Sequence, residues 1–79
     1  MATGHVQIYV PLLNEGTDVL RPTAGHFVRS DTVRVEALDD YDPIAEEWES
    51  PPGSDVHCVV EFRSGQQILV ARSRAFVHP

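Results

Sequence analysis

The sequence contains no lysine, and its six basic residues, all arginine, stand against twelve acidic residues. The formal net charge is -6 at neutral pH, with histidine counted as neutral. A chain this acidic is repelled by the phosphate backbone of nucleic acids unless its charges are strongly segregated. We therefore expect no nucleic-acid partner.

Cysteine occurs once, at Cys58, so no intramolecular disulfide can form and a disulfide-stapled secreted scaffold is excluded. A single thiol is simplest to maintain in a reducing compartment. The sequence has no apolar run long enough to span a membrane, and its N-terminal segment lacks the basic and apolar regions of a leader peptide. These absences predict a cytoplasmic protein that does not contact a membrane.

Signatures of several enzyme classes are also missing. The sequence has no G-x-S-x-G motif, no phosphate-loop motif and no C-x-x-C pair. Its four histidines are scattered without metal-ligand spacing. His57 and Cys58 are adjacent, so on a strand they point to opposite faces and form a poor catalytic pair. We predict a buried structural thiol at Cys58, no enzymatic activity and no cofactor.

Alternation of apolar and polar residues predicts short strands. Residues 6–10 and 32–38 alternate with the period of a half-buried strand. The expected inward-facing residues are Val6, Ile8 and Val10 in the first run and Val33, Val35 and Ala37 in the second. Between them, residues 19–29 read as a second strand that Pro22 interrupts and that Gly25 allows to bulge or bend. A short polar loop at Ser30 and Asp31 then leads into residues 32–38.

The strongest strand signal is a hairpin formed by residues 56–63 and 66–72, joined by Ser64 and Gly65. With a two-residue loop, the facing pairs are Val60 and Leu69, Cys58 and Ala71, Val59 and Val70, and Glu61 and Ile68. Both faces carry apolar residues, which predicts that one face is buried and that the other contacts a neighbour. We therefore expect self-association as a homodimer, through an exposed strand edge or through this hairpin.

Five short strands with regular turn signals and almost no helix predict one small all-β domain over residues 1–79. The expected architecture is a five-stranded antiparallel SH3-like barrel, and the alternative is a five-stranded oligonucleotide-binding barrel. Asp42 before Pro43 is typical of a helix start. Because only residues 43–48 could be helical, at most one helical turn is expected there. Pro52-Gly53 predicts a type II turn.

Half of the acidic residues lie within the segment from Asp39 to Glu49. Calcium and magnesium bind oxygen-rich loops, and the weak candidate ligands here are Asp39, Asp40 and Asp42. The spacing is not that of an EF-hand, so we predict a solvated loop rather than a metal site. A divalent-ion-responsive regulator using residues 39–49 is the alternative function.

Two aromatic residues stand within the acidic segment. The candidate partner-binding residues are Tyr41, Glu46, Glu47 and Trp48, which would present an acidic and aromatic surface to a basic or proline-rich protein. The competing interpretation, which we favour for Trp48, is that its ring caps the core of a small domain. The sequence thus predicts a small non-enzymatic interaction module whose partner is another protein or a second copy.

Two segments of the chain resemble a group of short, uncharacterised bacterial proteins. These proteins share a V-P-L-L-x-E-G-T-x-V-x-R-P opening and an E-x-W-x-x-P-P-G segment, which correspond here to residues 10–22 and 46–53. The resemblance implies a compact all-β bacterial domain and brings no established activity. The group often has Trp at the position of Leu20 and Phe at that of Ser50, so no shared aromatic cluster is implied.

The two motifs also contain the residues that we expect to be structural. These are Glu15, Gly16, Asp18, Arg21, Pro52 and Gly53. Because Arg21 is close in sequence to Glu15 and Asp18, we expect it to hold the opening turn by a charge-assisted hydrogen bond rather than to bind an anion.

Overall fold

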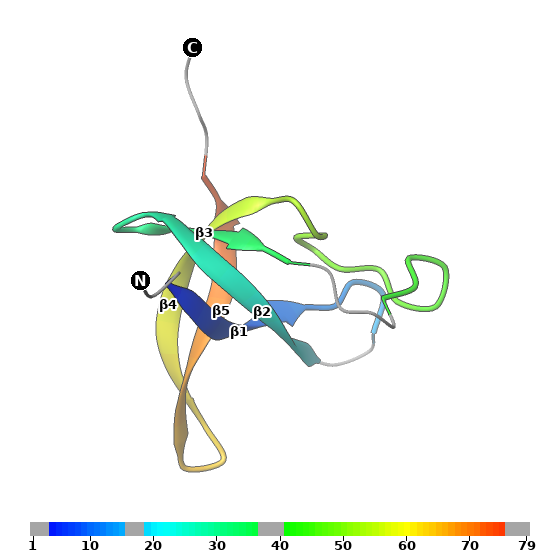
Figure 1. Ribbon diagram of the computed structural model, residues 1–79. Coiled ribbons are helices and arrows are strands. Elements are labelled where there is room, and N and C mark those ends of the chain that lie inside the picture. Colours follow the sequence, from blue (N-terminus) through cyan, green and yellow to red (C-terminus); the bar gives the residue numbers. More distant parts are fainter. Residues whose placement is uncertain (1–3, 16–18, 37–40, 76–79) are drawn as a thin grey trace.

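The computed structural model describes residues 4–15, 19–36 and 41–75, and within these ranges it contains strands but no helix. The strands are β1 (His5–Pro11), β2 (Leu20–Arg29), β3 (Thr32–Val35), β4 (Asp55–Arg63) and β5 (Gln66–Arg74). They close into a barrel in which each strand neighbours the next along the chain (Figure 1). The small all-β barrel expected from the sequence is confirmed. None of the described residues forms a helix long and apolar enough to cross a membrane.

Closure of the barrel depends on one short parallel seam. Four strand pairings are antiparallel, whereas β1 meets β5 in parallel through the single pair Tyr9 and Val70. Successive strands of a meander reverse direction, so the first and fifth strands run the same way and can pair only in parallel. The seam therefore departs from a purely antiparallel sheet. The meander order also excludes the oligonucleotide-binding barrel, which is a Greek key.

Strand β2 runs through Pro22 without a break, so the expected interruption is wrong. Pro22 lies outside the part of β2 that pairs with β3, which begins at Gly25. A missing N–H donor is tolerated at such an edge position. The register of β2 with β3 shifts between Phe27 and Arg29, so the irregularity lies beyond Gly25.

The core is built from alternate residues of the strands together with one tryptophan. Its buried members are Ile8, Val10, Val33, Val35, Trp48, Val56 and Ala71. Of the residues that alternation places inward, Ile8, Val10, Val33 and Val35 are confirmed as buried, and Val6 is partly buried against the core. Ala37 lies outside the described residues. Full burial of each valine or isoleucine side chain contributes about 1.5–3 kcal/mol, so these few side chains supply much of the stability of so small a domain.

The β4–β5 hairpin has the register that a two-residue loop predicts, with Val60 opposite Leu69 and Val59 opposite Val70. Ser64 and Gly65 both have positive φ, 52° and 79°, as a type I′ turn requires. Beyond the seam with β1, the end of the hairpin extends away from the other three strands (Figure 1).

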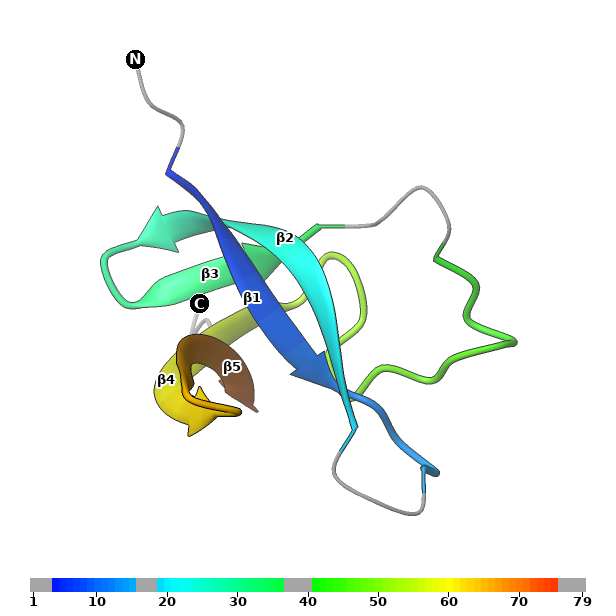
Figure 2. The ribbon, with the colours of Figure 1, turned by 90° about the horizontal axis from the view of Figure 1, so that it is seen from below.

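The long connection between β3 and β4 contains two predicted turns. Glu46 N donates to Asp42 O at 3.0 Å, which makes a single helical turn and no more. Ser54 N donates to Pro51 O at 3.1 Å around Gly53, whose φ is 92°, so the predicted type II turn is confirmed. Residues 41–50 lie apart from the free end of the hairpin in both views (Figures 1 and 2).

Candidate functional site

The four predicted partner-binding residues lie on the segment that precedes the Pro52-Gly53 turn. Trp48 is only 3% exposed and belongs to the core. The ring of Tyr41 packs against it edge-on, with 4.6 Å between centroids, and Trp48 Nε1 donates to Glu46 Oε1 at 3.2 Å. Trp48 therefore caps the core, as the competing interpretation proposed, and leaves almost no ring surface for a partner.

The two segments that carry the family resemblance lie side by side. Leu13 N donates to Glu47 O at 2.7 Å and Glu49 N donates to Pro11 O at 2.9 Å, on either side of a bridge between Leu12 and Trp48. The segment that contains Trp48 is thus paired with the end of β1. This pairing explains how a residue in a long loop reaches the core.

Arg21 links β2 to the acidic segment. Its Nε lies 3.4 Å from Glu46 Oε1, and both side chains are about one-third exposed. The expected link from Arg21 to Glu15 or Asp18 stays a prediction, because Gly16 and Asp18 lie outside the described residues. Arg21 is placed to join the two motifs, since the opening motif contains it and the later motif contains Glu46.

The acidic segment offers little to a metal ion in the part that the structure describes. Asp42 Oδ1 accepts a hydrogen bond from Ile44 N at 2.9 Å, and Glu47 Oε1 accepts one from Asn14 Nδ2. Asp39 and Asp40 lie outside the described residues. The divalent-ion role of residues 39–49 stays a prediction, and no observed contact favours it.

Cys58 is partly buried and packs against the core. Burial raises the pKa of its thiol above the ordinary value. Because the thiolate is the nucleophilic form, a raised pKa makes the residue less reactive. These properties are those expected of a structural thiol.

A groove of about 710 Å³ separates β1 from the outer part of the β4–β5 hairpin. Its lining residues are Val6, Gln7, Tyr9, Val60, Gln66, Gln67, Ile68 and Leu69, and none of them is charged. The groove exists because the two strands share only one residue pair. We call these residues, together with Phe62, the hairpin surface.

Apolar side chains remain exposed where the hairpin leaves the barrel. Val60 is 49% exposed and Phe62 is 74% exposed. Alternation places both on the face of β4 that carries Cys58 against the core. On the other face Val59 is 49% exposed, whereas its partner Val70 is fully buried. The predicted two-sided apolar hairpin is therefore most open on the face of Val60 and Phe62.

An ion-pair network holds the hairpin on the face opposite Phe62. Arg72 donates to both carboxylate oxygens of Glu61, at 2.6 and 2.9 Å, and Arg63 Nη2 donates to Oε1 at 2.9 Å. Charge-assisted hydrogen bonds of this kind stabilise the ionised carboxylate. They lower the pKa of Glu61 to about 2.

The lowered pKa of Glu61 predicts a specific pH dependence. A depressed pKa in the folded state stabilises the protein above the ordinary carboxyl pKa of 4.5, and this contribution is lost as the pH falls toward about 2. We expect the melting temperature of the native protein to fall more over this range than that of a Glu61→Gln variant. Carbon NMR of the Glu61 carboxyl group measures the pKa directly, and an ordinary value would contradict the prediction.

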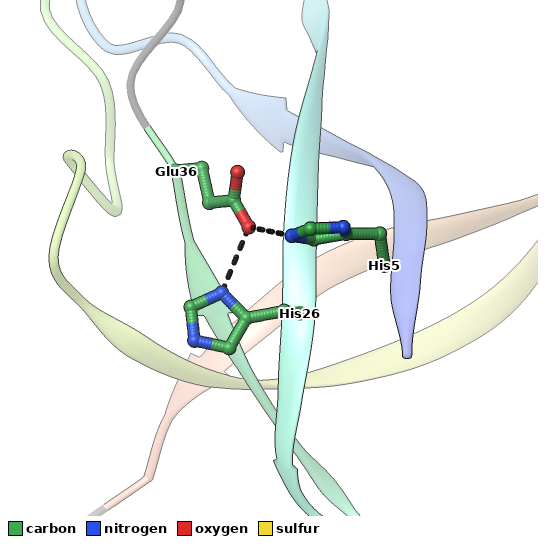
Figure 3. A group of neighbouring side chains, drawn as sticks. All are labelled: His5, His26 and Glu36. Atoms are coloured by element: carbon green, nitrogen blue, oxygen red, sulfur yellow. Dashed lines mark hydrogen bonds and ion pairs between the residues drawn. The ribbon is translucent and has the colours of Figure 1, made fainter. Parts of the chain in front are cut away.

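The structure also brings together three residues that the sequence left scattered. His5 of β1 lies opposite His26 of β2, and Glu36, just after β3, donates its backbone N–H to Ala24 O at 2.9 Å. All three side chains lie on the outer face of the barrel and converge on one point (Figure 3). In the sequence, the signal for this cluster was that each of the three residues alternates with buried residues and so faces outward. Alternation does not say which residues of neighbouring strands lie opposite each other.

Comparison of the chain with protein-family models, with curated proteins and with solved structures found no match.

Proposed function

We propose that this protein is a small, non-enzymatic interaction module of the bacterial cytoplasm, which self-associates through the hairpin surface. The observation that supports this proposal is the uncharged groove between β1 and the hairpin, in a chain with a net charge of -6. Cores of protein interfaces are depleted in charged residues and enriched in aromatic ones. Phe62 lies opposite Gln67, which lines the groove, and is the most exposed aromatic residue among those described.

A second copy of the chain is the partner that fits this surface. Two chains of the same net charge repel each other, and contact through an uncharged surface keeps the charged residues of both at a distance. The same surface on both chains gives a closed two-fold dimer rather than an open filament. Such a dimer would cover Val60 and Phe62, which otherwise expose apolar area to water.

Replacement of Phe62 by serine tests the proposal. Full burial of a phenylalanine side chain is worth about 1.5–3 kcal/mol, and a two-fold dimer contains two copies of the residue. We therefore expect Phe62→Ser to raise the dimer dissociation constant by at least about tenfold. Analytical ultracentrifugation over a wide concentration range measures this constant.

Ile44→Ser is the matched control. Ile44 is 95% exposed and belongs to residues 41–50, a segment that lies apart from the free end of the hairpin (Figure 1). Its replacement removes an equally apolar side chain and should leave the dissociation constant unchanged. A native protein that stays monomeric at the highest concentration would disprove self-association, and equal effects of the two variants would move the interface elsewhere.

A further inference from the structure

Three side chains on adjacent strands converge on the outer face of the barrel. Glu36 Oε2 lies 2.9 Å from His5 Nε2 and 2.8 Å from His26 Nδ1 (Figure 3). The two imidazole rings are almost perpendicular, at 89°, with 5.9 Å between their centroids. Each ring therefore directs one nitrogen at the same oxygen, instead of stacking on the other ring.

The three ligand atoms lie close enough together to be shared by one small cation. All of them lie within 4.8 Å of one another. Zinc binds imidazole nitrogen and carboxylate oxygen at about 2.0–2.2 Å, which places the ligand atoms of one tetrahedral ion roughly 3.3 Å apart. Small side-chain rotations suffice to admit an ion between them. We propose that His5, His26 and Glu36 form a binding site for a divalent transition-metal ion, and that zinc is the ion that these residues fit best.

The chemistry of the donors selects this class of ion. Two imidazoles and one carboxylate suit zinc and its neighbours in the transition series, whereas calcium and magnesium prefer oxygen ligands alone. Three protein ligands leave the fourth position of a tetrahedral ion open to water. That position faces outward, because the side chain of His5 is 58% exposed.

The backbone around Glu36 is held in place before any ion binds. Thr23 Oγ1 donates to Glu36 O at 3.0 Å, and Glu36 N donates to Ala24 O. Both contacts fix the residue against β2, the strand that carries His26. A site whose ligands sit on paired strands loses little freedom when it binds, which favours affinity.

The positive charge of Arg34 would oppose the binding of a metal ion at this site. Arg34 lies opposite His26 on β3, and alternation places it on the same outer face. Asp55 binds its guanidinium through two hydrogen bonds, Nε to Oδ1 at 2.8 Å and Nη2 to Oδ2 at 3.2 Å. This pairing compensates the charge of Arg34, so the outer face is not closed to a cation.

The alternative is that the cluster acts only as a clip between strands. In that case the two histidines donate to Glu36 and join β1, β2 and β3 without binding an ion. A clip predicts that substitutions change stability alone. A metal site predicts saturable binding that each of the three residues supports.

Isothermal titration of the untagged native protein with zinc chloride distinguishes the two. We expect one zinc ion to bind per chain, and expect His5→Gln and Glu36→Gln each to weaken binding by at least about tenfold. His5→Gln is the more informative variant, because this exposed side chain contributes least to packing. Thermal melting without zinc checks that each variant is folded.

His57→Gln is the matched control. His57 lies on β4, where its Nδ1 is 2.9 Å from Asp31 O, outside the cluster. The His57→Gln variant should bind zinc as the native protein does. In NMR spectra of the native protein, zinc should shift the ring signals of His5 and His26 but not those of His57. Absence of saturable binding, or equal affinity of the native and His5→Gln proteins, would overturn the site.

Discussion

Replacement of Trp48 by alanine is expected to reduce the free energy of unfolding by about 3–5 kcal/mol, the range for a buried tryptophan. Trp48 is 3% exposed, its ring contacts Tyr41, and its Nε1 donates to Glu46. A small domain has about 5–15 kcal/mol of total stability, so this loss leaves the variant close to unfolding at room temperature. Urea denaturation followed by far-ultraviolet circular dichroism measures the change without depending on the tryptophan itself.

Two control variants show what the loss at Trp48 depends on. Trp48→Phe retains an aromatic ring but removes the donor to Glu46. The lost hydrogen bond should reduce the free energy of unfolding by about 1 kcal/mol, in addition to the reduction caused by the smaller ring. Ile44→Ala lies in the same segment at a side chain that is 95% exposed, and should change stability by less than about 0.5 kcal/mol. A small effect of Trp48→Ala would show that the ring is not part of the core.

Gly25→Ala is expected to destabilise the barrel by about 1–3 kcal/mol, the range for an overpacked core. A Cβ atom at Gly25 would lie 2.5 Å from Val33 Cγ1, 3.1 Å from Arg34 O and 3.3 Å from Ile8 Cδ1. The first of these distances requires a neighbour to move, and Val33 and Ile8 are both buried. Chemical denaturation of the purified variant measures the loss.

A double variant identifies the cause of this loss. Val33→Ala removes the methyl group that the new Cβ would meet, so Gly25→Ala combined with Val33→Ala should cost less than the sum of the two single changes. Strict additivity would mean that the steric conflict is not with Val33. A stable Gly25→Ala protein would mean that β2 and β3 can separate locally.

Local patterns predicted the parts of the fold that depend on short stretches of chain. The alternation of β1 and β3 identified Ile8, Val10, Val33 and Val35 as inward-facing, because a strand has a side-chain period of two. The two residues between β4 and β5 fixed the register of that hairpin, since loop length sets which residues face each other.

Other features depended on contacts between distant segments. The break expected at Pro22 was wrong, because whether a proline is tolerated depends on which neighbour strand lies beside it. The sequence allowed Trp48 to be either buried or exposed. Its pairing with Leu12, just after β1, places it in the core. The alignment of His5 with His26 depends on the register between β1 and β2, and the residues between these strands, 12–19, are too many for the two-residue loop rule to set it.

The sequence by itself determined the fold class, the turns and the inward faces of several strands, because each follows from interactions between neighbouring residues. The tertiary structure alone decided the parallel seam, the uncharged groove beside it, the burial of Trp48 and the convergence of His5, His26 and Glu36. Each of these requires the relative position of strands that are far apart in the chain. Barrel closure sets that position, and neither side-chain period nor turn chemistry specifies it.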